Sequence, residues 1–356
     1  METLWFCIVA VMLTAYVLLD GFDLGVGIIH LIAAHTDGER SALISSIGPV
    51  WDGNEVWLLA AGGTLYFAFP GLYAAGFSGF YLALMIVLWL LMLRGIAVEF
   101  RGHIRNRMWS SFWDVVFCGA SLLIAVFYGA ALGNVVRGVP LDKDGYFFVP
   151  LWTTFHTGPE PGILDWYTAL VGIASLLVLT LHGALWVNLK TSGPVQQKAR
   201  RIASSVYWAA CAAVFAITIC SFLLQPQLEQ RFTAHPLLWG FPLIAALGLI
   251  VLRLSLSADL QLWAFIGSGT FIAGLLCSAA FGLYPLLLPA SNDVNLSLNV
   301  FNSAAPHYGL AAGLKWWIPG FALAITYSFF VYRHFRGKVV IPQPEFEHHL
   351  ASVAGE

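Results

Sequence analysis

The sequence contains few charged residues. Asp, Glu, Lys and Arg make up 10% of its 356 residues, whereas a soluble globular domain has roughly 25%. Hydrophobic residues account for 59%, and a chain this long and apolar does not have enough polar side chains to cover a water-facing surface. The composition therefore indicates a membrane protein. With 17 basic against 19 acidic residues, no excess of positive charge points to a nucleic-acid partner.

Cysteine motifs and an N-terminal basic cluster are also missing. The five cysteines lie inside apolar stretches and form no CxxC or CxxH spacing; they are Cys7, Cys118, Cys211, Cys220 and Cys277. Their odd number and their positions argue against a disulfide framework or a zinc site, and favour small buried apolar residues. The opening MetGluThrLeuTrp carries an acid and no positive charge cluster. The first apolar run therefore predicts a retained spanning helix rather than a signal peptide.

Nine apolar stretches approach or exceed the roughly 20 residues that a helix needs to cross a membrane. They cover residues 4–33, 54–69, 72–98, 109–135, 166–189, 203–224, 237–256, 260–288 and 310–332. The second stretch is the shortest, and an alternative is a start near Ala42 with a kink at Pro49; without it, eight helices remain. The sequence predicts one all-α transmembrane domain, residues 1–338, and a polar cytoplasmic tail, residues 339–356.

The distribution of basic residues predicts the orientation. If the N-terminus lies outside, 13 of the 17 Lys and Arg residues fall on the cytoplasmic side, as the positive-inside rule requires. An eight-helix arrangement that omits the short stretch would place the N-terminus inside and Arg40 outside, with only a slightly weaker bias. Both arrangements put the C-terminus in the cytoplasm, so that end is predicted more firmly than the helix count.

Two carboxylates lie within the first predicted helix. Asp20 is ~24 Å along the helix from Leu4, which places it deep in the bilayer, and Asp23 follows on a neighbouring position of the same face. Ionisable groups at this depth are costly and often functional. Two interpretations stay open: the carboxylates are paired inside the bundle, or they take part in proton movement. Gly21 and Gly25 form a small-xxx-small pattern that favours close helix packing.

A second polar cluster, Asp52 and Glu55, precedes the second predicted helix. The pattern is typical of a capping box, with Asp52 as N-cap and Glu55 at the third helical position, and Trp51 with Val56 as a hydrophobic staple. Under the predicted topology, this end faces the cytoplasm, where a carboxylate is also suited to collecting protons. Capping and proton uptake are compatible, so the local pattern does not separate them.

Further charges lie near the cytoplasmic ends of the third and fourth predicted helices. Arg94 is placed to pair with Asp114 or with Asp23, and breaking a buried pair of this kind is strongly destabilising. The basic residues that follow are interpreted as plain determinants of orientation; they are Arg101, Arg105 and Arg107.

Histidines are too sparse for a haem site. His30 and His182 are the two histidines that fall within predicted helices, and the sequence has no CxxCH motif. Haem iron requires axial ligands, so we predict that this chain ligates no haem and no metal.

The two polar clusters carry a resemblance to a known family. GlyPheAspLeuGlyValGly at 21–27, followed by TrpAspGlyAsnGluValTrpLeu at 51–58, resembles subunit II of cytochrome bd-type quinol oxidases. The similarity continues through 69–81, the region of Arg94, and TrpAsp at 113–114. Over the C-terminal half it weakens to a shared hydropathy pattern.

The resemblance implies a terminal respiratory oxidase of the bacterial inner membrane, electrogenic but not a proton pump. In this family a larger subunit I holds three haems, of b and d type, oxidises quinol and reduces oxygen to water. Subunit II supports it with two four-helix bundles and a peripheral helix, and ligates no haem. A structural quinone in subunit II is a further implication. The sequence leaves open where the quinone would bind, which haem serves the oxygen site, which quinol is used, and whether a small accessory subunit binds.

The resemblance also assigns roles to residues. The family's proton channel from the cytoplasm uses the aspartate that corresponds to Asp52, and Glu55 is its weaker neighbour. Asp23, Arg94 and Asp114 match charged positions on which the family relies for a stable haem-containing complex. Asp20 is a buried charge beside them.

Three other classes of protein are compatible with the hydropathy. A secondary transporter also has intramembrane carboxylates, but transporters often carry repeated halves with broken helices, and no matching pair is evident here. A self-contained membrane cytochrome is disfavoured by the shortage of histidines. A purely structural subunit differs from the favoured interpretation only in lacking the proton role.

Overall fold

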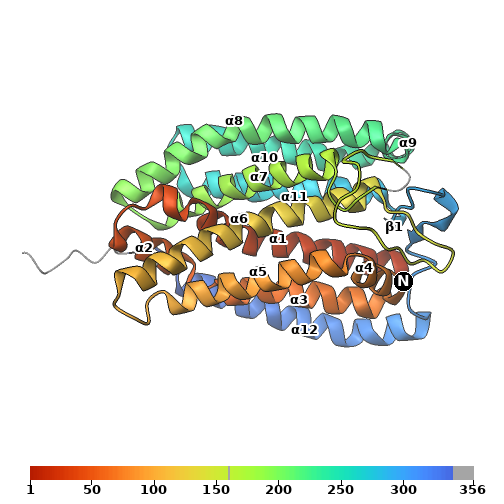
Figure 1. Ribbon diagram of the computed structural model, residues 1–356, viewed down its shortest axis with the longest axis horizontal. Coiled ribbons are helices and arrows are strands. Elements are labelled where there is room, and N and C mark those ends of the chain that lie inside the picture. Colours follow the sequence, from red (N-terminus) through yellow and green to blue (C-terminus); the bar gives the residue numbers. More distant parts are fainter. Residues whose placement is uncertain (159–160, 340–356) are drawn as a thin grey trace, which may run out of the picture.

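The computed structural model describes residues 1–158 and 161–339. Long helices lie side by side along one direction, and short connections join them at both ends (Figure 1). In this part of the chain, eight helices are long and apolar enough to cross a membrane, and a bent pair of helices makes a ninth candidate. The predicted all-α membrane fold is therefore confirmed.

The helices and strands have the following bounds. They are α1 (Glu2–Ala33), α2 (Asp37–Ile47), α3 (Trp51–Ala68), α4 (Pro70–Gly79), α5 (Tyr81–Phe100), α6 (Arg107–Arg137), α7 (Trp166–Lys190), α8 (Gly193–Leu224), α9 (Pro226–Ala234), the 3-10 turn η1 (Pro236–Trp239), α10 (Gly240–Ser257), α11 (Gln261–Leu283), β1 (Leu286–Leu288), the 3-10 turn η2 (Val294–Leu296), β2 (Leu298–Asn299) and α12 (His307–His334). The two strands pair antiparallel.

The long helices form two groups. In the first, α1 packs against α3 and α6, and α6 packs against α5. In the second, α7 packs against α8 and α11, and α10 against α11, while α1 and α6 both contact α7 and so join the groups. No residue in the most apolar segment of α12 is buried in this chain. This arrangement has the two bundles and the peripheral helix that the resemblance implied.

Glycines allow α1 and α7 to approach closely. A Cβ atom added to Gly25 would lie 2.1 Å from the carbonyl oxygen of Leu179 and 2.7 Å from Cα of Gly183. A Cβ atom added to Gly183 would in turn lie 2.2 Å from the carbonyl carbon of Gly25. Real Cβ atoms do not approach backbone atoms this closely, so positions 25 and 183 both require glycine. The packing role predicted for Gly25 is thus realised at the junction of the two bundles.

The second predicted span differs from the structure in two respects. The segment from residue 42 to 47 belongs to the separate helix α2, and α3 begins at Trp51. At its other end, α3 meets α4 with a bend of 120°, since Phe69 leaves helical geometry and Pro70 starts a new helix. The third span consequently begins at Tyr81 and not at residue 72.

Helix α2 is fixed at its N-terminus by a capping box. Glu39 Oε2 accepts hydrogen bonds from the backbone N–H groups of His35 and Thr36, at 2.7 and 3.3 Å, and Lys198 of α8 lies 3.3 Å from the same carboxylate. Burial acts to raise the pKa of Glu39, but these donors together lower it below its ordinary value. An ionised Glu39 therefore links α2 to the second bundle.

The C-terminal end of the peripheral helix α12 is held by hydrogen bonds to the rest of the chain. Lys190 Nζ donates to the carbonyl oxygen of Phe335 at 2.6 Å, and Lys338 Nζ donates to that of Thr191 at 2.8 Å. The backbone N–H of Val339 also donates to the Lys190 carbonyl, at 2.7 Å. The end of α12 is thereby joined to the connection between α7 and α8.

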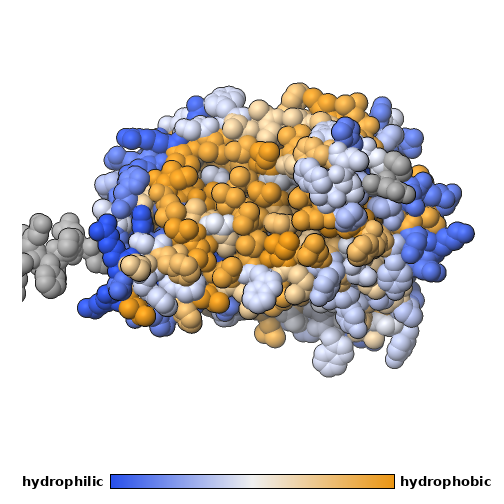
Figure 2. All heavy atoms as spheres, viewed as in Figure 1, coloured by the Kyte–Doolittle hydropathy of each residue, from blue (hydrophilic) through white to orange (hydrophobic). Residues whose placement is uncertain are grey.

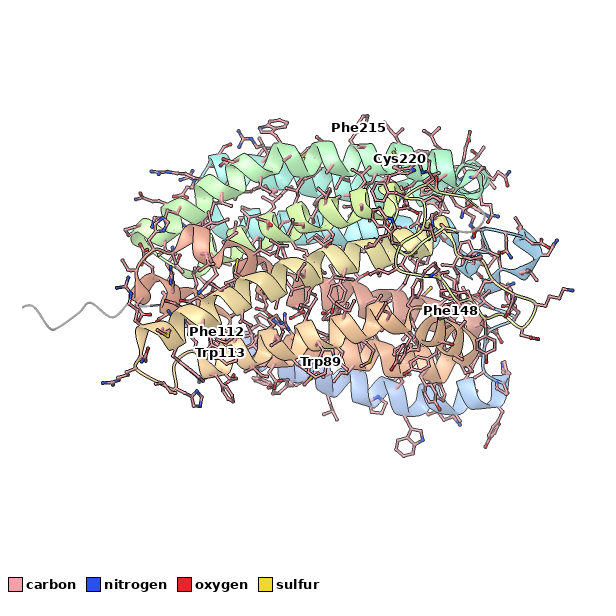
Figure 3. The ribbon with its side chains drawn as sticks, in the orientation of Figure 1. Trp89, Phe112, Trp113, Phe148, Phe215 and Cys220 are labelled. Atoms are coloured by element: carbon pink, nitrogen blue, oxygen red, sulfur yellow. The ribbon has the colours of Figure 1, made fainter. Side chains whose placement is uncertain are left out.

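The surface has an apolar middle and polar ends. Figure 2 shows a broad hydrophobic band across the helices, with hydrophilic residues gathered at both ends. Large apolar side chains are exposed within the band, including Trp89 on α5 and Phe215 on α8 (Figure 3). Such a surface is stable in lipid but not in water. The orientation of the two polar ends relative to the cytoplasm stays a prediction from the basic residues. The predicted tail after Val339 lies outside the described residues.

Candidate functional site

Arg94 of α5 lies at the centre of a buried charge network in the first bundle. Its Nη1 donates to Asp20 Oδ1 of α1 at 2.6 Å, and its Nη2 donates to Glu55 Oε2 of α3 at 2.9 Å. Arg94 is 1% exposed, Asp20 is fully buried, and Glu55 is 23% exposed. One guanidinium group therefore joins three helices through two carboxylates, a geometry that its planar fork of donors suits.

Asp23 takes part in a neighbouring set of hydrogen bonds. Asn54 Nδ2 donates to Asp23 Oδ2 at 2.7 Å and to the Leu19 carbonyl at 3.2 Å. The hydroxyl of Tyr332, on α12, donates to Asn54 Oδ1 at 2.7 Å. Asp23 is 1% exposed, and its Oδ1 atom has no hydrogen-bond partner among the described residues. Asn54, which belongs to α3, thus connects that helix to α1 and to the peripheral helix α12.

Two tyrosines extend the network from Asp20. The hydroxyl of Tyr16 donates to Asp20 Oδ2 at 2.8 Å, and the hydroxyl of Tyr128, on α6, lies 2.7 Å from that of Tyr16. Since Tyr16 gives its only hydroxyl proton to Asp20, Tyr128 is the donor in the second bond. Neither tyrosine was predicted from the sequence to belong to the site. Tyr16 stands four residues before Asp20, on the same helix face, which is the signal that would have found it.

Asp114 of α6 anchors a second cluster near the other end of these helices. It accepts from His30 Nε2 at 2.6 Å, from Arg101 Nε at 2.5 Å and from Arg40 Nη1 at 3.0 Å. Arg101 also donates to Asp37 Oδ1 at 2.7 Å. Burial tends to lower the pKa of Arg101, but its contacts with Asp114 and Asp37 raise it overall. The cluster holds α2 against α1 and α6.

These contacts correct three sequence-based interpretations. Arg94 pairs with Asp20 of α1 and Glu55 of α3, and not with Asp23 or Asp114, because its long side chain extends from α5 to both of those helices. Arg101 is not a plain orientation determinant, since it is 7% exposed and bonded to Asp114. The proposed capping box of α3 is absent: Val50 is the N-cap and makes no side-chain bond, because the helix starts one residue before Asp52.

Asp52 lies apart from both clusters. It is exposed and lines a groove of about 680 Å³ between α3 and α12, together with Trp57, Phe321 and Tyr327. The structure gives Asp52 no hydrogen bond or ion pair to another described residue. Its carboxylate is thus the acidic group of a largely apolar groove. Glu55, one helical turn further along α3, connects this region to Arg94.

The two helical histidines are both engaged within the chain. His30 bonds to Asp114, while His182 Nε2 donates to the Leu18 carbonyl at 3.0 Å, and its Nδ1 lies 2.7 Å from Ser268 Oγ. Over residues 1–158 and 161–339, no three metal-ligating side chains come together. That this chain ligates no haem remains a prediction.

Comparisons with known proteins agree with one another. Residues 1–335 match the family model described as cytochrome bd terminal oxidase subunit II. The chain is 30% identical to the probable cytochrome oxidase subunit 2 of Haemophilus influenzae, covering 94% of each chain. It is 32% identical to the cytochrome bd ubiquinol oxidase subunit 2 of Bacillus subtilis, covering 87% of this chain and 88% of that one. Its fold matches a chain of the bd oxidase of Geobacillus thermodenitrificans with a TM-score of 0.71 and 16% identity, covering 94% of this chain and 98% of that chain.

Proposed function

This chain belongs to the family of cytochrome bd terminal oxidase subunit II, and we propose that it supports the haem-bearing subunit I and helps to deliver cytoplasmic protons for the reduction of oxygen. The resemblance seen at residues 21–27 and 51–58 is thereby confirmed, and the chain is a subunit of a quinol oxidase complex. A secondary transporter is no longer a competing interpretation. The bacterial inner membrane is its proposed location.

The position of Asp52 is the observation that best supports the proton role. Its carboxylate has no partner in the described chain and borders the groove between α3 and α12. Glu55 lies three residues further on, so the two carboxylates occupy neighbouring positions on α3. A proton taken up by Asp52 passes to Glu55, whose other oxygen is free of the 2.9 Å bond to Arg94. Asp52 collects the proton and Glu55 brings it to the buried network.

The remaining charged residues have a supporting role in this proposal. Arg94, Asp20 and Asp23 fix α1, α3 and α5 relative to one another, and Asp114 fixes α2 and α6. In this proposal the haems of subunit I supply the redox chemistry, as the resemblance implies. A structural quinone and a small accessory subunit are compatible with the proposal but are not needed for it.

Replacing Asp52 with asparagine tests the proton role. The substitution preserves side-chain shape but removes the proton acceptor, so oxygen consumption by the purified complex is expected to fall about tenfold or more, as for the loss of other proton-transfer groups. Haem content per protein should not change. Glu99→Gln is a suitable control, because Glu99 is exposed on α5 and outside the groove. Normal turnover in a fully assembled Asp52→Asn complex would contradict this role.

Purification in mild detergent through a tag on this chain tests the partner. We expect a larger subunit to copurify with haem, visible as absorption bands in the reduced-minus-oxidised spectrum. Dissociating the two subunits should leave the haem with the larger one. Recovery of this chain from native membranes without haem, or of haem on the isolated chain, would each refute the proposed division of roles.

A further inference from the structure

His182 of α7 reaches across the junction of the two bundles to the backbone of α1. Its Nε2 donates to the Leu18 carbonyl oxygen at 3.0 Å, and the residue is 1% exposed. Among the described residues this is the hydrogen bond that joins α7 to α1. The neighbouring Gly183 brings the two backbones together, but a close apolar contact is not directional. The histidine therefore supplies the bond that fixes α1 along and around its own axis relative to α7.

Helix α11 holds the ring of His182 in this orientation. A carbonyl oxygen can only accept, so Nε2 carries a proton. The buried ring bonds to no carboxylate in the described chain and is therefore neutral, which makes Nδ1 the acceptor of the Ser268 hydroxyl at 2.7 Å. The ring also stacks on Phe265, with centroids 4.7 Å apart and planes inclined by 9°. Both contacts come from α11, so the second bundle fixes the donor that α1 receives.

The Leu18 carbonyl lies in the turn of α1 that carries a buried carboxylate. Asn54 of α3 donates to the adjacent Leu19 carbonyl at 3.2 Å, and Asp20 follows with its bond to Arg94 of α5. Consecutive positions on a helix are rotated by ~100°, so α7, α3 and α5 contact this turn from different sides. A displacement of α1 at Leu18 would therefore move Asp20 relative to Arg94.

The bond from His182 is not needed to satisfy buried polar groups. The Leu18 carbonyl lies inside α1, where the N–H of Phe22, four residues on, is its intrahelical partner. Ser268 Oγ also lies 2.7 Å from the Phe265 carbonyl oxygen of its own helix, to which it can donate when the ring is absent. An apolar residue at position 182 would leave no buried donor or acceptor without a partner, and such exchanges are nearly neutral for stability. A role in placing α1 accounts for a polar ring here.

We propose that His182 is a positioning residue, which acts through the Leu18 carbonyl to hold Asp20 and Asp23 where proton delivery requires them. The ring itself exchanges no proton in this role. The inference rests on the proposed proton uptake by this subunit. It extends the proton-delivering site into the second bundle, which the proposed function does not use.

His182→Leu and His182→Gln separate positioning from packing. Leucine is close to histidine in volume but has no polar atom, whereas glutamine keeps an N–H donor near the place of Nε2. We expect the His182→Leu complex to keep its haem content and thermal midpoint while kcat for oxygen consumption falls severalfold, because small misplacements slow steps that depend on geometry. The KM for quinol should not change. His182→Gln should restore most of the lost kcat.

Thr180→Val is the matched control on the same helix. The Thr180 hydroxyl is buried and bonds at 2.6 Å to the Leu176 carbonyl of its own helix, so its loss leaves α1 in place and kcat unchanged. Normal kcat in the His182→Leu complex, or a fall no larger than its loss of haem, would overturn the inference. An equal fall in the leucine and glutamine variants would also overturn it, because the missing donor would then not be the cause.

Asp52→Asn, measured in parallel, distinguishes this inference from the proposed function. Proton uptake by each complex in proteoliposomes is the readout, and both Asp52→Asn and His182→Leu are expected to slow it. If only Asp52→Asn slows uptake, the positioning role fails and the proposed function stands. If neither variant does, both fail. If only His182→Leu does, the histidine affects a step other than delivery from Asp52, and both are overturned.

Discussion

Arg94→Leu is expected to lower the yield of folded, haem-containing complex more than tenfold. The substitution leaves Asp20 as an uncompensated carboxylate in a fully buried position and removes the partner of Glu55. Removing one member of a buried ion pair typically costs about 3–5 kcal/mol, a large share of the stability of a folded protein. Haem per protein after purification, and the thermal unfolding midpoint, are the measurements.

Two further variants give this prediction its controls. Arg94→Lys keeps the charge, but a single ammonium group does not reproduce the fork that reaches both carboxylates, so partial recovery is expected. Arg105→Leu removes an exposed arginine and should have little effect. Equal yields of the Arg94→Leu and Arg105→Leu complexes would show that the buried network does not stabilise the assembly.

Gly25→Ala is expected to be nearly as damaging, although it adds a single methyl group. The new carbon would lie 2.1 Å from the Leu179 carbonyl oxygen and 2.7 Å from backbone atoms of Gly183. Overpacking a core usually costs about 1–3 kcal/mol, and here the opposing atoms are backbone that no rotamer change can move. We expect the two bundles to separate locally and the thermal midpoint of the purified complex to fall by several degrees.

Gly62→Ala is the matched control for this effect. Gly62 lies within α3 and has nothing within 4 Å of an added Cβ, and alanine favours a helix over glycine by about 1 kcal/mol. The two alanine variants should therefore shift the thermal midpoint in opposite directions. A Gly25→Ala midpoint at or above that of the original chain would contradict the close contact of α1 with α7.

The fold was largely predictable because lipid restricts the choices. A chain in a bilayer must satisfy its backbone hydrogen bonds internally, so apolar runs of sufficient length predict helices, and eight of the nine runs correspond to long helices. The second run is the exception, for a physical reason. Pro49 and Pro70 bound α3, and hydropathy does not indicate whether a proline kinks a helix or ends it.

The candidate site was predictable in its residues but not in its pairings. Asp20, Asp23 and Arg94 were identified because charges at membrane depth are rare. The partners of Arg94 depend on how three helices pack, which no spacing within one helix reveals. Arg101 was misjudged for the same reason. It stands beyond the end of α5, where basic residues are common, and only its contact with Asp114 distinguishes it.

The attachment of α12 has a consequence for the order in which the protein matures. Membrane chains are synthesised from the N-terminus, and domains fold as they emerge. Asn54 can contact Asp23 early, but among the described residues the donor to its Oδ1 atom is Tyr332, near the end of the last helix. The contacts of Lys338 and Val339 then secure that helix. The hydrogen bonds beside Asp23 are therefore complete only after residue 332 has been synthesised. A chain that ends earlier lacks the donor to Asn54 Oδ1.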